Sequence, residues 1–322
     1  MGTTAVDQTP TTPTPAPATP AGDAGGAHVR VAIIGAGFTG LAMVHAMRRA
    51  GIEDWLIVER SEDVGGVWRS NTYPGIACDV PSHLYSFSFA PNPDWERTFS
   101  SGRQIWEYAQ QVARDLNIAE RTRFGEEVLD AAWDEDRAVW VIRTTTLELT
   151  ADVLIDGSGV LTDPTYPDIE GLDRFEGALF HSGDWNHDHD LTGERVAIIG
   201  TGASAIQIVP ELQKRVARLT VFQRTPGWVI PRNDRDVTDA ERRVLRAVPQ
   251  LQKLIRGWQF VYRDGVMLKV MHHRNFRRFI QAISKAYMRA TIDDPALRAK
   301  LTPTFEIGCK RILITSVWYP AL

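Results

Sequence analysis

Residues 29–40 read VRVAIIGAGFTG, an apolar run that ends in a glycine-rich turn. The run predicts a buried strand, FTGLAMVHAMRRAG (38–51) predicts a helix, and WLIVER (55–60) predicts the next strand. A strand, a helix and a strand in this order form a unit that is typical of dinucleotide binding. The glycines of the turn follow the spacing G-x-G-x-x-G, at Gly35, Gly37 and Gly40.

Each glycine of this turn has its own expected role. Gly35 permits the tight turn, Gly37 lets the backbone approach a pyrophosphate, and Gly40 lets the helix pack close to the strand. The helix N-terminus then presents free N–H groups to the phosphates. Glu59 lies 24 residues after Gly35, where a carboxylate accepts hydrogen bonds from ribose hydroxyls. The first unit is therefore predicted to bind a dinucleotide that has no 2′-phosphate.

A second unit repeats this pattern further along the chain. RVAIIGTGA (195–203) predicts a strand and a turn, SAIQIVPELQKRV (204–216) a helix, and RLTVFQR (218–224) a second strand. The positions that correspond to the three glycines are Gly200, Gly202 and Ala205. Two such units in one chain predict two nucleotide-binding domains in tandem.

The second unit differs from the first in the charge that follows its second strand. Arg224 lies 24 residues after Gly200, the same offset that separates Glu59 from Gly35. A carboxylate would repel a ribose 2′-phosphate, whereas a guanidinium binds it through two hydrogen bonds, and Thr225 adds a hydroxyl. The second unit is therefore predicted to bind NADP(H). Two dinucleotide sites imply electron transfer between a permanently bound FAD and a visiting NADPH.

These patterns predict an α/β fold with two tandem, three-layer Rossmann-like domains, a helical insertion and a disordered N-terminal tail. The tail has almost no large apolar residue, so burial cannot offset its ordering entropy. Residues 126–157 alternate polar and apolar side chains and predict a β-meander. The expected boundaries are 1–28 for the tail, 29–165 for the FAD-binding domain, 166–193 for a linker, 194–235 with 301–322 for the NADP-binding domain, and 236–300 for the helical insertion.

Composition excludes several other classes of protein. The 322 residues are 24% charged and 43% hydrophobic, which is typical of a globular protein. A net charge of −4 gives no overall basic field for nucleic acid, so nucleic acid is not an expected partner. Two cysteines, Cys78 and Cys309, cannot stabilise a small secreted domain, which predicts a cytoplasmic location. The apolar run 31–47 is short and contains three glycines, so no transmembrane segment is expected.

Two further stretches leave alternatives open. Residues 241–300 carry 14 Lys and Arg against 4 Asp and Glu. A solvated helical face is the favoured interpretation, a membrane surface or substrate channel the second, and nucleic-acid binding the third. HSGDWNHDHD (181–190) contains three histidines, but it lies in a polar linker without the fixed elements that zinc sites use, so no metal is predicted.

The linker contains the pattern F-x-G-x-x-x-H-x-x-x-W, formed by Phe175, Gly177, His181 and Trp185. A second pattern, [AG]-G-x-W-x-x-x-x-[FY]-P-[GM]-x-x-x-D, matches residues 65–79. With these two motifs the chain resembles the Baeyer–Villiger monooxygenases, a branch of the class B flavin-dependent monooxygenases, from about residue 29 onward. The related heteroatom-oxidising enzymes usually have Tyr or Phe in place of this Trp, so Trp185 favours the Baeyer–Villiger branch.

The resemblance implies a function and several site residues. The implied enzyme uses NADPH and FAD to insert one oxygen atom of dioxygen into a ketone through a flavin peroxide, giving an ester or a lactone. Arg311 matches the family's cation beside the flavin, Asp79 the carboxylate that orients it, and Lys310 a second cation on the NADP 2′-phosphate. Gly66 and Trp68, together with Asp79, match cofactor-binding positions. His181 matches a position in the linker that organises the two domains and has no role in the chemistry.

The resemblance leaves two alternatives to that function. An N- or S-oxidising flavin monooxygenase would use the same two cofactors. Members of the family also continue well past the segment that corresponds to GCKR (308–311), whereas this chain stops at Leu322. We therefore expect a C-terminally truncated chain in which both nucleotide domains are incomplete. The second alternative is accordingly a catalytically inactive, nucleotide-binding fragment.

Overall fold

The computed structural model describes residues 27–322, so the predicted N-terminal tail lies outside the described residues except for Ala27 and His28. These two residues begin strand β1 (Ala27–Ile34), which corrects the predicted boundary at residue 28. The imidazole of His28 lies 3.0 Å from the hydroxyl of Thr150 and 3.2 Å from the carboxylate of Asp152. The strand therefore extends beyond its apolar residues. The apolar pattern of the sequence does not predict this extension, because polar contacts hold it.

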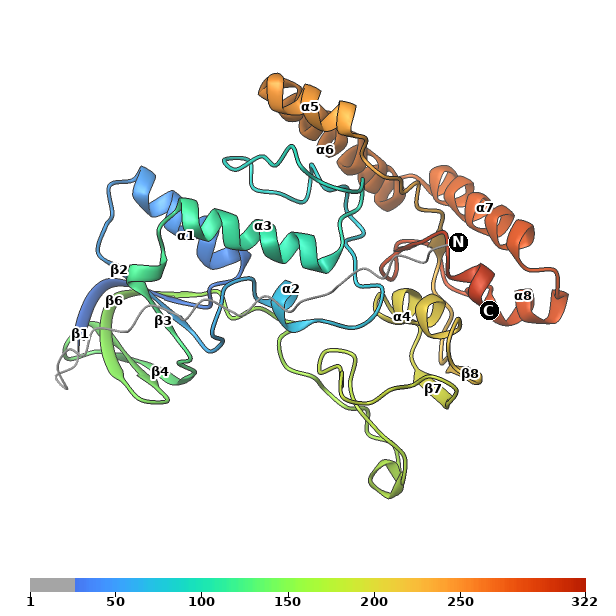
Figure 1. Cartoon of the computed structure of the whole chain (residues 1–322), viewed down its shortest axis with the longest axis horizontal. Coiled ribbons are helices and arrows are strands. Elements are labelled where there is room, and N and C mark those ends of the chain that lie inside the picture. The colour runs from blue at the N-terminus through green and yellow to red at the C-terminus, as the bar shows by residue number, and fades with distance from the viewer. Residues whose placement is uncertain (1–26) are drawn as a thin grey trace, which may run out of the picture.

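The first unit forms a six-stranded sheet with the order β3-β2-β1-β6-β5-β4 (Figure 1). β1, β2, β3 and β6 pair in parallel, and β4, β5 and β6 form the antiparallel meander that was predicted for residues 126–157. The strands after β1 are β2 (Trp55–Glu59), β3 (Thr122–Phe124), β4 (Val128–Asp134), β5 (Val139–Thr144) and β6 (Glu148–Asp156).

This unit has three layers. Helices α1 (Phe38–Arg49) and α3 (Gly102–Asp115) cover one face of the parallel strands, where Leu41 and Ile105 join the largest buried cluster. The meander covers the opposite face, where Ile142 and Leu149 pack against Ala32. Burial on both faces explains why β1 and β2 are continuously apolar in sequence. The α/β class and the three-layer arrangement are confirmed for this unit.

The second unit is built on a shorter sheet. β7 (Arg195–Ile199) pairs in parallel with β8 (Arg218–Phe222), and helix α4 (Ala205–Leu212) connects them. α4 ends four residues before the predicted bound at residue 216. β9 (Val229–Ile230) and β10 (Leu313–Ile314) form a separate parallel pair that packs with α4 in one apolar cluster. The chain therefore leaves this unit after β9 and returns to it at β10.

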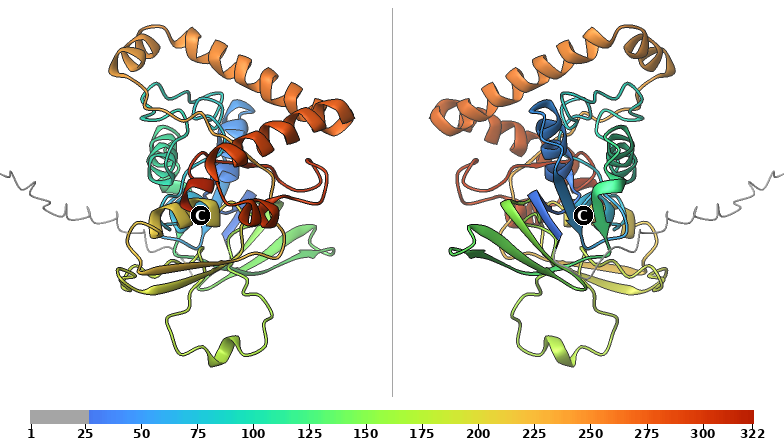
Figure 2. Two further views of the ribbon diagram at one scale, coloured as in Figure 1. Left: turned by 90° about the vertical axis from the view of Figure 1, so that its right-hand side faces the viewer. Right: turned by 90° about the vertical axis from the view of Figure 1, so that its left-hand side faces the viewer.

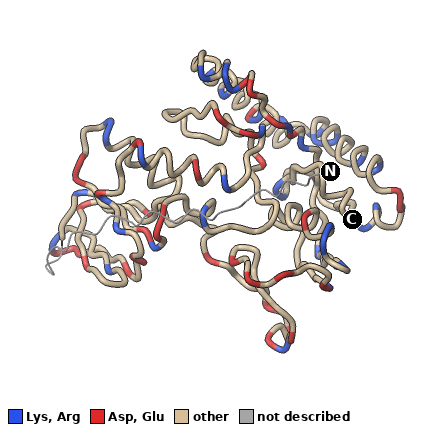
Figure 3. The backbone as a smooth tube through the Cα atoms, in the orientation of Figure 1, with Lys and Arg blue, Asp and Glu red and all other residues tan. Residues whose placement is uncertain are grey.

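Between β9 and β10 the chain forms the predicted helical insertion. Its helices are α5 (Asp239–Ala247), α6 (Pro249–His272), α7 (Arg274–Thr291) and α8 (Pro295–Leu301). Figure 3 shows Lys and Arg distributed along α5, α6 and α7. α6 is mostly exposed, and its large exposed apolar side chains include Leu254, Trp258 and Val261. Within residues 27–322, no helix combines the length and the apolar character that crossing a bilayer requires.

The segments that connect the two units contain little regular structure. Helix α2 (Val67–Ser70) is one turn long, and short 3-10 turns occupy Ala119–Arg121, Leu172–Arg174 and Tyr319–Ala321. The linker forms a loop that projects away from the side that carries α6 and α7 (Figure 2). The other predicted domain boundaries stay predictions.

Candidate dinucleotide sites

The first glycine turn is shaped by close backbone contacts. Gly35 has φ +92°, and a Cβ atom there would lie 2.7 Å from the carbonyl oxygen of Gly157. A Cβ atom on Gly40 would lie 2.2 Å from the carbonyl oxygen of Gly35, so α1 can approach β1 only with glycine at this position. The roles predicted for these two glycines therefore agree with their geometry.

Gly37 has no comparable contact within the chain. A Cβ atom there would meet only Gly66, at 3.7 Å from its Cα atom, which is an ordinary van der Waals distance. Packing alone therefore does not require glycine at position 37. Its absent side chain leaves bare backbone directly before the first residue of α1, and this is the space that a pyrophosphate needs.

Glu59 is buried at this turn and both of its carboxylate oxygens accept backbone hydrogen bonds. The amide of Ala36, inside the turn, donates to Oε2 at 2.7 Å, and the amide of Ser61 donates to Oε1 at 2.8 Å. Glu59 is only 6% exposed. A carboxylate oxygen has two lone pairs, so each oxygen retains one for a further donor such as a ribose hydroxyl.

The second glycine motif packs against the first turn. The amide of Gly65 donates to the carbonyl of Ala36 at 3.1 Å, and Gly66 has φ +54°. A Cβ atom on Gly65 would lie 2.6 Å from the ring of Trp106. Trp68, one turn further on, donates its indole N–H to the hydroxyl of Tyr85 at 2.9 Å. Gly66 and Trp68 therefore lie beside the turn where a cofactor was predicted.

The second glycine turn is more open than the first. Gly200 has φ +114° and Gly202 is exposed, and a Cβ atom on either would meet nothing within 4 Å. Ala205, in the third position, is buried in the first turn of α4, where its methyl group fits. The amide of Gly200 donates to the carbonyl of Phe222 at 2.9 Å, which brings the end of β8 to the turn.

Arg224 is exposed at the mouth of this turn. It lines a cavity of about 410 Å³ together with Thr201 of the turn and Lys300 of α8. The hydroxyl of Thr201 lies 3.5 Å from the carbonyl oxygen of Thr225, which places Thr225 beside the same turn. The predicted second cation, Lys310, does not line this cavity, and its Nζ atom lies 5.0 Å from the centre of the Phe305 ring.

Residues 73–79 of the second family pattern join the two units. The side-chain amide of Gln207, on α4, accepts from the amide of Ala77 at 3.1 Å and donates to its carbonyl at 3.0 Å. The hydroxyl of Tyr73 donates to the same amide oxygen at 3.3 Å. A Cβ atom on Gly75, which has φ +79°, would lie 2.6 Å from the carbonyl of Gln207. Residues 73–79 of this motif therefore form an interdomain joint, and its role in binding a cofactor stays a prediction.

The joint ends in the predicted pair of Asp79 and Arg311. Nη2 of Arg311 lies 2.5 Å from Oδ2 of Asp79, although the two residues are 232 positions apart in sequence. The carboxylate side chain is 23% exposed and the guanidinium side chain is 63% exposed. Asp79 therefore holds one end of Arg311 in place while the rest of the cation faces solvent.

Two further arginines, which the sequence analysis did not single out, surround this segment. Arg263 of α6 donates to the carbonyl of Asp79 at 3.3 Å, and Arg232 donates to the carbonyl of Cys78 at 3.5 Å. Burial lowers the pKa of Arg263. Burial also raises the pKa of the Cys78 thiol to about 11. No motif marks either arginine, since each position is set only by the tertiary fold.

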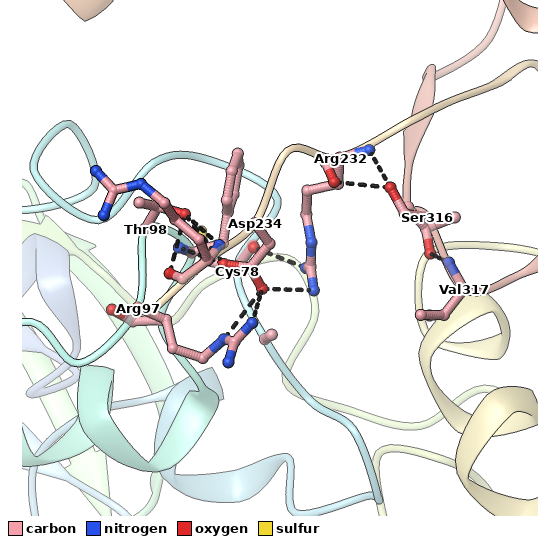
Figure 4. A network of polar contacts seen from close by, with 12 residues as sticks. Cys78, Arg97, Thr98, Arg232, Asp234, Ser316 and Val317 are labelled. Atoms are coloured by element: carbon pink, nitrogen blue, oxygen red, sulfur yellow. Dashed lines mark hydrogen bonds and ion pairs between the residues drawn. The ribbon is translucent and has the colours of Figure 1, made fainter. Parts of the chain in front are cut away.

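A polar network around Asp234 joins the same two units at a second place (Figure 4). Oδ2 of Asp234 accepts from Arg97 at 3.1 Å and from Arg232 at 3.2 Å, and Oδ1 accepts from the hydroxyl of Thr98 at 3.1 Å. The hydroxyl of Ser316 donates to the carbonyl of Arg232 at 2.7 Å. The network therefore connects the segment that precedes α3 to the strand pair β9–β10.

The linker motif does not form one cluster. Phe175 is 59% exposed on the projecting loop, where its ring covers Gly177. The Nδ1 atom of His181 accepts from the amide of Gly183 at 2.9 Å, and its ring lies edge-on to the ring of Tyr166. Trp185 packs with Tyr73 and with residues of α4. Of the four motif positions, Trp185 is therefore the one that packs with a residue of the joint, and the organising role of His181 stays a prediction.

The remaining histidines of the linker bind separate partners. His187 Nε2 lies 2.7 Å from the hydroxyl of Thr72, and His189 Nε2 lies 3.1 Å from the carboxylate of Glu194. Among residues 27–322, no group of three or more His, Cys, Asp or Glu side chains is placed to hold a metal ion.

Comparison with known proteins gives consistent results. Residues 28–285 match the family described as flavin-binding monooxygenase-like. The chain is 55% identical over 295 residues to a Baeyer–Villiger monooxygenase of Streptomyces coelicolor, covering 92% of this chain and 57% of the relative. It is 44% identical over 313 residues to a Baeyer–Villiger monooxygenase of Pseudomonas aeruginosa, covering 97% of this chain and 58% of the relative.

Solved structures of monooxygenases share the fold. An oxidized steroid monooxygenase bound to NADP superposes with a TM-score of 0.77 at 30% identity, covering 91% of this chain and 64% of that protein. A complex of the protein OTEMO with FAD and NADP superposes with a TM-score of 0.80 at 26% identity, covering 91% of this chain and 64% of that protein. This chain therefore spans less than two thirds of the length of these relatives.

The fold and the two glycine turns define the class: a protein with two Rossmann-type units that polar contacts join. The sequence match narrows this class to one family. The chain belongs to the flavin-binding monooxygenase-like family.

Proposed function

We propose that this chain is an NADPH- and FAD-dependent monooxygenase of the Baeyer–Villiger type, which inserts one oxygen atom of dioxygen into a ketone to give an ester or a lactone. The observation that carries the proposal is the pair of glycine turns with partners of opposite charge, Glu59 and Arg224, joined through residues 73–79. The similarity to two named Baeyer–Villiger monooxygenases supports the ketone as the substrate class.

The first unit has the features that FAD requires. The backbone at Gly35, Gly37 and Gly40 would receive the pyrophosphate at the N-terminus of α1. Glu59 would accept hydrogen bonds from ribose hydroxyls through the lone pairs that Ala36 and Ser61 leave free. The remaining contacts would come from Gly66 and Trp68, which lie beside the turn.

The second unit has the features that NADP(H) requires. Gly200 and Gly202 leave open backbone at the turn, and Ala205 allows α4 to begin beside it. Arg224 would bind the 2′-phosphate through its guanidinium, with Thr225 beside it. Lys310 remains a candidate for the same phosphate from sequence resemblance alone.

When bound, NADPH and FAD supply the reducing equivalents that activate dioxygen. This chain contributes a cation, Arg311, whose position is fixed before any substrate binds. Asp79 holds Arg311 through the 2.5 Å contact, so the guanidinium need not reorient when negative charge develops on the ketone oxygen. Arg263, bound to the carbonyl of Asp79, fixes the backbone that carries this carboxylate.

Product analysis tests the proposal. The purified protein is reconstituted with FAD and incubated with NADPH, dioxygen and either a cyclic ketone or an alkyl aryl sulfide. Formation of a lactone from the ketone is the expected result. Sulfoxide as the sole product would favour a heteroatom oxidase. A protein that stays colourless after reconstitution with FAD would favour an inactive nucleotide-binding fragment.

A pair of variants connects the activity to the site. Arg311→Ala is expected to abolish lactone formation because it removes the fixed cation. Arg289→Ala, an exposed arginine on α7, is the matched control and should retain the activity.

The proposal includes a cytoplasmic location, supported by Cys78 and Cys309, which are both free thiols.

A further inference from the structure

The cavity at the second glycine turn is lined by two cations from different elements. Arg224 follows the end of β8, and Lys300 comes from the last turn of α8. Thr201 of the glycine turn precedes both cations in the sequence and lines the same cavity with its hydroxyl-bearing side chain. No Asp or Glu side chain lines it, and most of its other lining residues are apolar, among them Trp318 and Leu322, the last residue of the chain. The lining therefore offers positive charge and a hydroxyl donor beside an open nucleotide turn.

Specific contacts hold Lys300 at this place. The side-chain amide of Gln223 donates to the carbonyl of Lys300 at 3.1 Å. Gln223 directly precedes Arg224 in the sequence. The hydrogen bond therefore holds the backbone of Lys300 next to the segment that carries Arg224. Leu301 is buried in the adjoining apolar cluster, and the carboxylate of Asp294 caps the start of α8 at 2.8 Å from the amide of Ala296.

The chemistry of the pair matches a phosphate monoester. A phosphate monoester carries nearly two negative charges at neutral pH, because its second pKa is about 6. Arg supplies a planar, two-pronged donor and Lys supplies a mobile point charge, so the two bind one phosphate in complementary ways. The family resemblance assigns this partnership to Lys310, but Lys310 lies over Phe305 and does not line the cavity.

We propose that Lys300 is a specificity-determining residue that binds the 2′-phosphate of NADP(H) beside Arg224. This inference rests on the proposed assignment of NADP(H) to the second unit. It adds a residue that no sequence motif marks, on an element outside the two-stranded unit that carries the glycine turn.

Calorimetric binding of two nucleotide fragments tests the inference without any turnover. 2′,5′-ADP carries the 2′-phosphate and 5′-AMP lacks it. The wild-type chain is expected to bind 2′,5′-ADP more tightly. Lys300→Ala should weaken 2′,5′-ADP about three- to ten-fold, the range of one exposed charge contact, and leave 5′-AMP unchanged. Lys300→Arg should restore most of the loss because it keeps the positive charge.

Two further variants complete the design. Lys214→Ala removes an exposed lysine that pairs with Glu211, and it should bind both fragments as the wild type does. Arg224→Ala should lose most of the preference for 2′,5′-ADP. Lys300→Gln, which keeps most of the side-chain length, replaces Lys300→Ala if the alanine variant unfolds.

The outcomes separate the two proposals. A wild-type chain that binds both fragments equally, or neither, overturns the assignment of NADP(H) to this unit and the inference with it. A wild-type chain that prefers 2′,5′-ADP, with an Arg224→Ala variant that loses this preference and a Lys300→Ala variant that keeps it, overturns the role of Lys300 alone.

Discussion

At the scale of single residues, Glu59 shows how a spacing in the sequence corresponds to a physical constraint in the structure. Its carboxylate is buried and accepts two backbone N–H groups, one of which belongs to the glycine turn itself. The same group therefore fixes the shape of the turn before any nucleotide binds. Arg224 has no such internal role and is exposed at its turn. The two residues differ in structural importance even though their offsets in sequence are equal.

Glu59→Gln is expected to weaken FAD binding and to destabilise the turn. The amide would direct an N–H group at the N–H of Ala36 or Ser61, and a lost hydrogen bond to a charged group costs about 1.5–3 kcal/mol. FAD affinity, measured by fluorescence titration, should fall at least ten-fold, since 1.4 kcal/mol corresponds to about ten-fold. Glu62→Gln, at an exposed position, is the control. Equal affinities in the two variants would contradict this role.

The two thiols are expected to differ strongly in reactivity. Cys309 is exposed, whereas Cys78 is buried and burial raises its pKa to about 11. A raised pKa favours the protonated form, so at pH 8 only about one in a thousand Cys78 side chains is a thiolate, and the fraction increases as the pH rises toward 11. Iodoacetamide at pH 8 should therefore add one label per native chain.

Intact-mass measurement checks this, with Cys309→Ser as the comparison. The serine variant should stay unlabelled under native conditions and take one label after denaturation. Rapid labelling of the native serine variant would show that Cys78 is not protected.

At the scale of elements, the two glycine turns make different demands. A Cβ atom on Gly40 would lie 2.2 Å from a backbone oxygen, so Gly40→Ala must displace α1 and should cost about 1–3 kcal/mol of folding stability. Gly202 has open space around it, so Gly202→Ala should fold as the wild type does. Its added methyl group should instead weaken NADP(H) binding at the turn.

Urea denaturation and calorimetry measure these two effects separately. The expected pattern is a lower unfolding midpoint for Gly40→Ala alone and weaker nucleotide binding for Gly202→Ala with an unchanged midpoint. The reverse pattern would mean that the second turn is the packed one.

The sequence predicted most of the elements because their signals are local. Apolar runs and glycine spacing located β1, α1, β2, β7 and β8, and alternation located the meander. The sequence could not predict contacts between residues that lie far apart in the chain. The pairing of Gln207 with Ala77, the arginines at Cys78 and Asp79, and the position of Lys300 all join residues more than 70 positions apart. The pairing of Asp79 with Arg311 was predicted only because a family resemblance supplied it.

At the scale of the whole molecule, Asp234 is the group that most directly couples the two units. Its side chain is 12% exposed and accepts hydrogen bonds from both sides of the interface. Asp234→Asn removes the negative charge between Arg97 and Arg232, and we expect a loss of about 1–3 kcal/mol in the free energy of unfolding.

Asp236→Asn is the matched control for this prediction. Asp236 also pairs with Arg97, at 2.6 Å, but its side chain is 83% exposed. Exposed ion pairs contribute about 0–1 kcal/mol, so its urea midpoint should change little. Equal shifts of the urea midpoint in the two variants would show that burial of Asp234 does not increase its contribution to stability.

The Gln207 amide engages both the N–H and the C=O of Ala77, and this has a mechanical consequence. A gradual slide of one unit over the other would lengthen both bonds at once and leave two backbone groups unpaired. The amide therefore fixes the position of Ala77 relative to α4, because a shift along the interface would break both hydrogen bonds together. Any reorientation of the two units would accordingly require this one side chain to give up two hydrogen bonds, in addition to the contacts made by Asp79 and Asp234.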